Sequence, residues 1–353
     1  MSPTEPLADE LWALVDWHRQ RCEPYRRLLE LFHPSPPADR GLSELPWLPV
    51  SLFKSHRLLS VPEEQVFREL SSSGTQGPPS RIVLDRATAS AQTQALSRSL
   101  RALLGPARLP MLIVDRESIL RPQGGVTART AGVLGMMTFG RDHLFLLDEQ
   151  EQPRLPELHA WLARHGGAPF FAFGFTGLVW QGLRAAAELD LARGGPGPDL
   201  SQGILLHGGG WKRLIAQAVD RDSFRQTLGR LTGLTRIHDF YGMVEQIGTV
   251  YLEGPDGLLH PSPYGELIIR DPITLRPCPE GQPGLVQALS VLPRSYPGHS
   301  LLTEDIGSWH RADTPRGRAW RIHGRLPRAE ARGCSDTLVS RPTATSSGAG
   351  APP

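Results

Sequence analysis

Hydroxyl side chains and glycines gather in one segment, SSSGTQG at residues 71–77, with the composition of an anion-binding loop. Glycines let a backbone approach a ligand closely, and N–H and O–H groups donate hydrogen bonds to phosphate oxygens. The segment is not a Walker loop, because no G-K-[ST] sequence follows it. Surface turns favour the same residue types, so composition alone leaves an anion-binding loop and an ordinary turn equally open.

A run of three glycines stands in the segment HGGGWK, residues 207–212, directly after an apolar stretch. A strand that delivers glycines into the start of a helix has the geometry that binds a nucleotide edge or a phosphate. The same run also suits a tight strand-to-helix connection without a ligand. For a lone glycine run, that second interpretation is the more common one.

An aromatic residue, a glycine and an acid follow one another in HDFYGMVEQ, residues 238–246. At the end of a strand, Tyr241 could stack on a planar ring, and Glu245 could hold a cation. Taken alone, the sequence favours the second interpretation of Glu245, an ordinary carboxylate at a helix start, where the helix dipole favours negative charge.

Two further motifs near the C-terminus carry opposite charges. Asp305, in the segment LTEDIG, is expected just past a strand, where a carboxylate can accept hydrogen bonds from two sugar hydroxyls. The alternative is an Asp-stabilised turn before Gly307. Arg325, in the segment IHGR, could clamp a phosphate with two hydrogen bonds, or it could form a surface ion pair of little energetic value.

Alternating strands and helices must position these motifs. Apolar residues at spacings of three and four predict helices, whereas short apolar or alternating runs predict strands. The expected helices span residues 7–32, 86–104 and 176–192, and the expected strands span 66–70, 81–85, 111–115, 143–148 and 169–175. A strand–glycine turn–helix unit at 203–219, a strand, loop and helix start at 235–248, and short strands from 264 onward complete the pattern. The run MLIVD at 111–115 is typical of a buried parallel strand. The predicted fold class is α/β, with a β-rich C-terminal part.

The composition limits the classes of partner. The chain has 353 residues, with 38 Lys and Arg against 36 Asp and Glu and a net charge of +2. This balance gives no electrostatic case for binding nucleic acid or an anionic membrane. With 37 Gly and 33 Pro, the sequence favours many turns and argues against a helical bundle.

The expected location is a reducing cytoplasm. Three cysteines, Cys22, Cys278 and Cys334, lack metal-ligand spacing and cannot all pair within one chain. The first residues lack the cationic start and apolar core of a signal peptide. The most apolar stretch, 168–183, is too short and too rich in glycine to span a membrane.

Although each motif alone is weak, their order and spacing are specific. A serine-rich loop, a glycine turn, DFYGMVEQ, TEDIG and HGR, in this order, resemble the adenylate-forming superfamily of acyl-CoA synthetases, firefly luciferase and peptide synthetase adenylation domains. Within it, the sequence is most similar to the acyl-protein synthetases (long-chain-fatty-acid–protein ligases) of bacterial luminescence operons. The segments LPWLPVSLFKSHRLLSV, FRELSSSGTQGPPSRIVLD, HGGGWK and GRLPRAEARGCS support this, and the resemblance covers roughly residues 40–338.

The resemblance implies a domain organisation. It predicts an N-terminal helical segment at 1–40, an α/β adenylate-forming core at 41–260, a β-rich part of the same adenylating domain with an acyl-acceptor segment at 261–340, and a disordered tail at 341–353. The fold would be the large N-terminal domain of the superfamily without its full mobile C-terminal subdomain.

The resemblance also implies a site for ATP and Mg²⁺. Ser72, Ser73, Gly74, Thr75 and Gly77 would hold the β- and γ-phosphates, and Gly208, Gly209 and Gly210 would flank the adenine. Tyr241, followed by Gly242, would stack on the adenine, Glu245 would bind Mg²⁺, Asp305 would accept the ribose hydroxyls, and Arg325 would contact phosphate or ribose.

Two departures from the superfamily affect the mechanism. Its phosphate loop usually ends in lysine, whereas Arg81 stands just beyond this loop. Its C-terminal subdomain carries a catalytic lysine, whereas the last lysine here is Lys212. In the resembling synthetases a cysteine near the C-terminus accepts the acyl group, and Cys334 stands at that place. Neighbouring Arg332 would favour its reactive thiolate.

The resemblance therefore implies ATP-dependent activation of a carboxylic acid, with a fatty acid as the expected substrate, to acyl-AMP with release of pyrophosphate. The acyl group would pass to Cys334 for delivery to an acyl-reductase partner, with an acyltransferase as a further possible partner. Two alternatives stay open: an acid–coenzyme A ligase like the phenylacetate–coenzyme A ligases, and a non-catalytic nucleotide-binding subunit. Acid-dependent pyrophosphate exchange and coenzyme A consumption separate these three functions.

Overall fold

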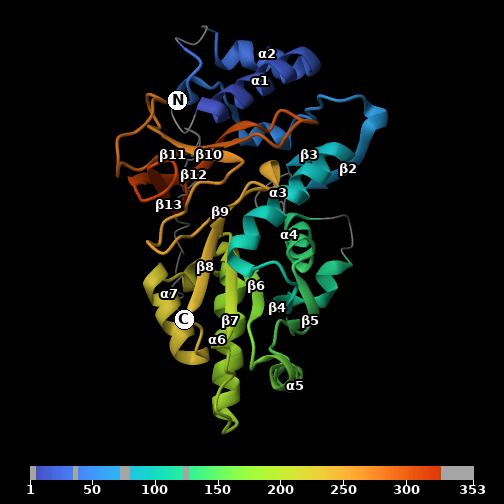
Figure 1. Cartoon of the computed structure of the whole chain (residues 1–353), viewed down its shortest axis with the longest axis vertical. Helices are drawn as coiled ribbons and strands as arrows, with labels where there is room; N and C mark the ends of the chain where they lie inside the picture. The colour runs from blue at the N-terminus through green and yellow to red at the C-terminus, as the bar shows by residue number, and fades with distance from the viewer. Residues whose placement is uncertain (1–4, 35–38, 72–79, 122–126, 327–353) are drawn as a thin grey trace, which may run out of the picture.

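The computed structural model describes residues 5–34, 39–71, 80–121 and 127–326 (Figure 1). In the view of Figure 1, a six-stranded sheet occupies the lower half of the molecule and a five-stranded sheet the upper half. The described helices are α1 (Glu5–Arg21), α2 (Glu23–Phe32), α3 (Arg86–Leu104), α4 (Ala128–Met137), α5 (Leu155–His165), α6 (Thr176–Ala192) and α7 (Arg221–Thr232). The predicted helices at 86–104 and 176–192 are confirmed as α3 and α6.

The six-stranded sheet has the order β5-β4-β6-β7-β8-β9. Its strands are β4 (Leu109–Arg116), β5 (Gly140–Leu147), β6 (Phe170–Phe175), β7 (Gly203–Gly208), β8 (Arg236–Tyr241) and β9 (Tyr251–Leu252). Strands β4 to β8 are parallel to their neighbours, and β9 runs antiparallel to β8. The prediction of a buried parallel strand at 111–115 is confirmed, because β4 lies between β5 and β6 with its apolar side chains buried.

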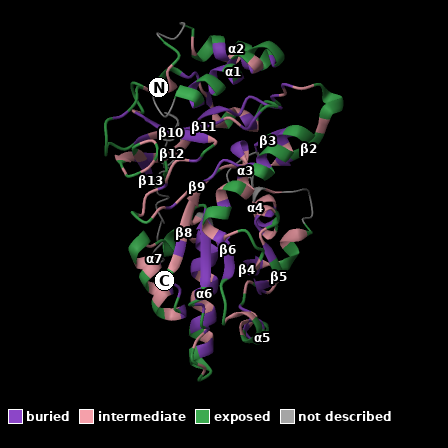
Figure 2. Cartoon of the chain, viewed as in Figure 1, coloured by how far each residue is buried: buried purple, intermediate pink, exposed green. Residues whose placement is uncertain are grey.

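Helices cover both faces of this sheet, and β6 shows how the sequence divides between them. Phe170 and Ala172 pack into a core with α5, α6 and α7, whereas Phe171 and Phe173 pack into a second core with α3 and α4. Successive side chains of a strand point to opposite faces, so a strand covered on both sides must be apolar throughout. Figure 2 shows the result: the central strands are buried, and the exposed surface lies on the outer sides of the helices.

The five-stranded sheet has the order β1-β12-β11-β10, with β13 added beside β12. Its strands are β1 (Leu48–Pro49), β10 (Gly265–Arg270), β11 (Gly284–Ser290), β12 (Ser300–Arg311) and β13 (Arg318–Arg325). The short strands expected from residue 264 onward are therefore present. The strands predicted at 66–70 and 81–85 are present as β2 (Val66–Ser71) and β3 (Arg81–Asp85), and the structure pairs them antiparallel in a separate two-stranded sheet.

The expectation that Asp305 lies past a strand or in a turn before Gly307 is wrong. Both residues lie inside β12, because this strand continues through a register shift at Ile306 and Gly307 and pairs with β13. Asp305 stands directly opposite Arg325 in that pairing.

Three local predictions also differ from the structure. The helix expected at 7–32 is two helices, because Cys22 has an extended backbone and Pro24 starts a new helix where its missing N–H costs nothing. The glycine turn after β7 leads into a 3₁₀ turn, η5 (Lys212–Gln217), and the helix start expected before 248 is the 3₁₀ turn η6 (Val244–Gln246).

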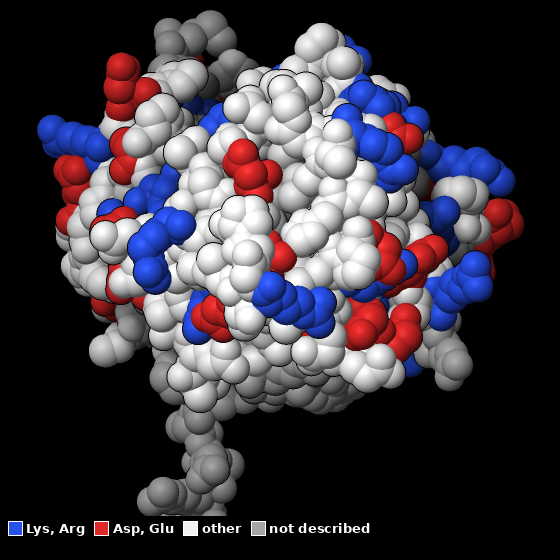
Figure 3. Space-filling model, turned by 90° about the horizontal axis from the view of Figure 1, so that it is seen from below, with Lys and Arg blue, Asp and Glu red and all other residues white. Residues whose placement is uncertain are grey.

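Among the described residues, no helix is long and apolar enough to cross a membrane. On the face seen from below in Figure 3, basic and acidic side chains are interspersed and form no extended patch of one sign.

Candidate functional site

The strand order places several motifs at one edge of the six-stranded sheet. The chain runs from β4 to β5 on one side and then returns to β6 on the other side of β4. In open α/β sheets, ligands bind outside the carboxyl ends of the strands where the order reverses in this way. The glycine run follows the carboxyl end of β7, and the DFYG segment forms the carboxyl end of β8.

Two of the three glycines after β7 are required by the local structure. A Cβ atom at Gly208 would lie 2.5 Å from the ring of Phe240 on the neighbouring strand. Gly209 has a φ of +74°, a conformation that L side chains rarely adopt. At Gly210 a Cβ atom would meet nothing within 4 Å. Glycine is therefore structurally necessary at the first two positions, and the third borders open space.

Tyr241, Asp305 and Arg325 come together from three strands of the two sheets. The Tyr241 hydroxyl donates a hydrogen bond of 2.8 Å to Oδ2 of Asp305. Nε of Arg325 donates one of 3.2 Å to Oδ1 of the same carboxylate. The sequence singled out all three residues, and the structure joins them at the carboxyl end of β8.

The electrostatics of this group suit ligand binding. Burial and the Asp305 carboxylate raise the pKa of Tyr241 well above its usual value, so its hydroxyl remains a donor. The Asp305 side chain is 16% exposed and that of Arg325 is 64% exposed. A carboxylate offers about four lone-pair positions, so Asp305 can accept further hydrogen bonds while it holds Tyr241 and Arg325.

Glu245 lies in η6 and is only 6% exposed. Burial raises the pKa of its carboxyl group, while a hydrogen bond from Ser80 and the charges of Arg325 and Lys54 act in the opposite direction. The backbone here is fixed, because the Tyr296 hydroxyl donates to the Glu245 carbonyl at 2.8 Å. The next residue, Gln246, donates through its amide to the carbonyls of Ala288 and Gly298.

The Glu245 carboxylate fits a magnesium site that a nucleotide completes. Within the described ranges, no group of three or more His, Cys, Asp and Glu residues could hold a metal ion. Mg²⁺ in nucleotide sites is commonly bound by one or two carboxylates together with substrate phosphates. One carboxylate ligand, Glu245, with Arg325 and Lys54 close by, is compatible with a Mg²⁺ ion that the protein and the nucleotide phosphates bind together.

Several predicted site residues lie outside the described part of the chain. These are Ser72, Ser73, Gly74, Thr75, Gly77 and Cys334. Both flanks of the serine-rich segment are described: Ser71 ends β2 and stands opposite Arg81 of β3. Gly242 is described, and a Cβ atom there would make only an ordinary contact, at 3.5 Å from the Thr249 carbonyl.

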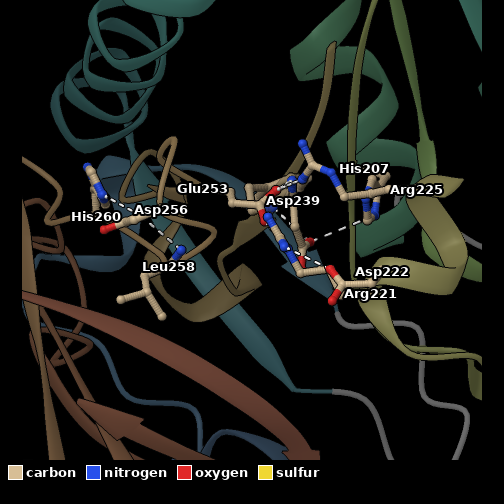
Figure 4. A network of polar contacts seen from close by, with 10 residues as sticks. His207, Arg221, Asp222, Arg225, Asp239, Glu253, Asp256, Leu258 and His260 are labelled. Atoms are coloured by element: carbon tan, nitrogen blue, oxygen red, sulfur yellow. Dashed lines mark hydrogen bonds and ion pairs between the residues drawn. The ribbon is translucent and has the colours of Figure 1, made fainter. Parts of the chain in front are cut away.

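A polar network beside the glycine run was not anticipated from the sequence (Figure 4). Glu253, almost fully buried, accepts hydrogen bonds from Arg221, from Arg225 at 2.8 Å and from the Asp239 backbone N–H at 3.0 Å. These contacts hold α7 against the ends of β8 and β9. Because the partners are 14 to 32 residues apart in the chain, no local sequence signal could have revealed the network.

His207 and Asp239 face one another in this network without forming an ion pair at neutral pH. Nδ1 of His207 lies 3.8 Å from Oδ1 of Asp239 and within hydrogen-bond distance, 3.1 Å, of the Thr176 hydroxyl. Burial lowers the pKa of His207 to about 3. Desolvation and the adjacent Glu253 carboxylate raise the pKa of Asp239 to about 7. His207 is therefore neutral near pH 7, where Asp239 titrates, and the Asp239 side chain is 49% exposed.

Comparisons with known proteins match one family along most of this chain. The model of the family described as "Acyl-protein synthetase, LuxE" matches residues 5–343. The long-chain-fatty-acid–luciferin-component ligase of Vibrio harveyi is 26% identical over 350 residues, covering 94% of this chain and 87% of that protein. The protein of the same name from Aliivibrio fischeri is 25% identical over 348 residues, covering 92% and 85%.

Solved structures share the fold. A 2-hydroxyisobutyryl-CoA ligase, crystallised in an open conformation with 2-HIB-AMP and CoA, matches 91% of this chain and 74% of its own, with a TM-score of 0.68 and 17% identity. The same ligase in its postadenylation state with 2-HIB-AMP matches with a TM-score of 0.67 and 17% identity, over 91% of this chain and 67% of that one.

Proposed function

The chain belongs to the LuxE family of acyl-protein synthetases, ligases of the adenylate-forming type, and on that basis we propose that it activates a long-chain fatty acid with ATP and then carries the acyl group on Cys334. The first step forms acyl-AMP and pyrophosphate. The second forms a thioester and releases AMP.

In the first step, a carboxylate oxygen of the acid attacks the α-phosphorus of ATP. A new P–O bond forms, and the bond between the α-phosphorus and the oxygen bridging to the β-phosphate breaks, so pyrophosphate leaves with that electron pair. Little covalent chemistry falls to the protein in such a displacement, so positioning and charge stabilisation carry the catalysis.

Individual residues have distinct tasks in this proposal. Asp305 accepts the ribose hydroxyls, and Tyr241, fixed by its hydrogen bond to Asp305, presents its ring to the adenine beside the glycine run. Arg325, held against Asp305, contributes positive charge toward phosphate or ribose. The serine-rich segment, Ser72, Ser73, Gly74, Thr75 and Gly77, binds the β- and γ-phosphates.

Glu245 would hold Mg²⁺ together with the phosphates. The ion, when bound, supplies Lewis-acid charge stabilisation at the phosphate oxygens. The protein keeps the buried Glu245 in position through the hydrogen bonds of Tyr296 and Gln246. The charges of Arg325 and Lys54 lie close to its carboxylate.

In the second step, the Cys334 thiolate attacks the acyl carbonyl carbon. An S–C bond forms, the C–O bond to AMP breaks, and the thiol proton passes to solvent. Cys334 follows nine residues after Arg325, and an extended chain spans at most about 3.3–3.6 Å per residue. The cysteine can therefore lie up to about 30 Å from a residue that itself contacts Asp305, a distance that allows it to reach the acyl group.

The observation that carries this proposal is the convergence of Tyr241 and Arg325 on the Asp305 carboxylate at the carboxyl end of β8. Separate regions of the sequence supply a ring, an acceptor for hydroxyls and a cation at the carboxyl edge of the sheet, the edge at which open α/β sheets bind ligands.

Exchange of labelled pyrophosphate into ATP tests the adenylation step. We expect exchange that depends on a fatty acid and needs no coenzyme A. A folded protein that shows no exchange with fatty, aryl or amino acids would contradict adenylation and favour a non-catalytic nucleotide-binding subunit.

Covalent labelling tests the second step. With ATP, Mg²⁺ and a labelled fatty acid, the protein should carry label that neutral hydroxylamine releases. Cys334→Ser should abolish this label and leave pyrophosphate exchange nearly unchanged, while the matched variants Cys22→Ser and Cys278→Ser should label normally. Label on another residue, or coenzyme A consumption in its place, would overturn the role of Cys334.

A thioester on the protein is a substrate for reduction. We therefore propose that an acyl-reductase consumes it, and that an acyltransferase is a further partner. The chemistry of the product requires only that the next enzyme accept an acyl group from a thiol.

A further inference from the structure

Lys54 ends the 3₁₀ turn η2 (Val50–Lys54), which packs against both β3 and β12. The preceding residue, Phe53, is fully buried and meets the ring of Tyr296 edge-on, with the ring centroids 6.0 Å apart. The hydroxyl of Tyr296 in turn donates to the carbonyl of Glu245. Buried contacts therefore anchor Lys54 to the segment that carries the candidate metal ligand.

The ammonium group lies within electrostatic reach of the Glu245 carboxylate, as does the guanidinium of Arg325. Ser80, which precedes β3, donates a hydrogen bond to the same carboxylate. The Lys54 side chain is partly exposed. None of the ion pairs within the described part of the chain involves Lys54. Its positive charge thus lies near the Glu245 carboxylate, and no ion pair of 4.0 Å or less engages it within the described residues.

The sequence makes this position unusual. Lysine occurs only at 54 and 212 in the whole chain, and no lysine stands between residues 71 and 85. An ammonium group is a compact charge with three donors, and it binds phosphate oxygens as a point charge, unlike the planar fork of arginine.

We propose that Lys54 is a catalytic residue whose ammonium group binds the β- and γ-phosphate oxygens of ATP and stabilises the leaving pyrophosphate. This inference rests on the adenylation function proposed above. As the bond from the α-phosphorus breaks, negative charge grows on the pyrophosphate, so a fixed cation there stabilises the transition state more than bound ATP. The other role open to Lys54, stabilising Glu245 alone, would act on ATP only through the Mg²⁺ that Glu245 holds, so it would leave binding of ATP and pyrophosphate without Mg²⁺ unchanged.

Equilibrium binding to the full chain without fatty acid separates these two roles. Lys54→Gln should weaken binding of ATP and of pyrophosphate about 10- to 100-fold both with and without Mg²⁺, the value of one charge-assisted hydrogen bond or slightly more. It should leave AMP binding within about twofold, because AMP lacks both distal phosphates. Lys54→Arg should recover part of the loss. The matched control Arg57→Gln removes an exposed cation paired with Glu63 from the same segment and should bind all three ligands normally.

Amine footprinting of the wild-type protein gives a second measurement that needs no variant. With only two lysines in the chain, acetylation at residue 54 can be read directly by mass spectrometry. Pyrophosphate and MgATP should protect Lys54 several-fold, whereas AMP should not.

Equal weakening of ATP and AMP by Lys54→Gln, unchanged binding of all three ligands, or absence of protection by pyrophosphate would each overturn the proposal. Failure of adenylation itself looks different: the wild-type chain would then show no acid-dependent exchange. If the wild-type chain exchanges pyrophosphate and Lys54→Gln binds ATP normally, only the role of Lys54 is contradicted, and the adenylation function stands.

Discussion

Asp305 is the side chain on which the candidate site depends most directly. It receives the hydroxyl of Tyr241 on one oxygen and the guanidinium of Arg325 on the other, and it is itself mostly buried. Its backbone N–H donates to the Thr303 hydroxyl at 3.1 Å, which fixes the carboxylate further. Such a preorganised acceptor can bind ribose hydroxyls without first reorganising its own surroundings.

We predict that Asp305→Ala weakens ATP binding by about 2–4 kcal/mol, because two charge-assisted hydrogen bonds to the ribose are lost. Fatty-acid binding should change far less. Titration calorimetry with ATP, and separately with the acid, measures both. The matched variant Tyr241→Phe keeps the aromatic ring and removes only the hydroxyl. It should weaken ATP binding by about 1 kcal/mol or less. Unchanged ATP affinity in folded Asp305→Ala would assign Asp305 a purely structural role.

At the scale of elements, the close approach of β7 and β8 determines which glycines of the run 208–210 can be replaced by a larger residue. Gly208 stands opposite Phe240 in the parallel pairing of these strands, and the Phe240 ring occupies the space a Cβ atom would need. The strands cannot separate freely, because β7 is hydrogen-bonded to β6 on its other side.

We predict that Gly208→Ala lowers the free energy of unfolding by about 1–3 kcal/mol, the usual cost of overpacking. Gly210→Ala, with nothing within 4 Å of its Cβ, should change it by less than about 0.5 kcal/mol. Urea unfolding of the two variants checks this comparison. Equal stability of the two variants would contradict the close packing of β7 on Phe240.

At the scale of the whole molecule, buried histidines join the N-terminal helices to the five-stranded sheet. His18 of α1 lies 2.7 Å from the Ser60 hydroxyl and 3.1 Å from the Pro293 carbonyl, and its ring stacks on that of His299 with centroids 4.9 Å apart. Tyr25 of α2 meets His299 edge-on. Both histidines are buried, and α1 and α2 share one core with strands β1, β10, β11 and β12.

This junction should make part of the stability depend on pH. Burial lowers the pKa of His18 to about 3, with Arg294 and Arg21 adding to the effect. The folded-state pKa lies below the unfolded value of about 6.5. The unfolded chain therefore binds the proton more readily, and His18 destabilises the fold progressively as the pH falls from about 6.5 toward 3.

We predict that the free-energy difference between wild type and His18→Gln changes by about 1.4 kcal/mol between pH 7.5 and 5.5, with the wild type losing more stability. Comparing the two proteins isolates the contribution of His18. Asp239, whose pKa is raised to about 7, makes stability depend on pH in the opposite direction, but it does so equally in both proteins. Urea unfolding at the two pH values measures the difference. A difference independent of pH would mean that His18 takes up its proton in the fold without penalty.

The amino-acid sequence was enough to predict those local elements whose pattern of apolar residues has an unambiguous period. The α3 and α6 helices and the strands β3, β4 and β6 were predicted closely, because continuous apolar runs and helical spacing leave little choice of structure. The order of the motifs also predicted the family, because each motif alone is weak evidence whereas their order and spacing along the chain are specific. Helices such as α5 and α7 were missed, and the break at Cys22 went unnoticed.

Which chemical groups meet depends on how the elements pack in three dimensions. Asp305 was expected just past a strand or in a turn, but pairing with β11 and β13 carries β12 through it and brings Arg325 opposite. The segment around Lys54 supported the family resemblance but indicated no role for the lysine, and its place beside Glu245 depends on the packing of Phe53 on Tyr296. Glu253 collects two arginines and a backbone N–H from distant segments. Local spacing fixes elements because their hydrogen bonds are local, whereas a site joins side chains far apart in sequence, and only packing between elements decides which of them touch.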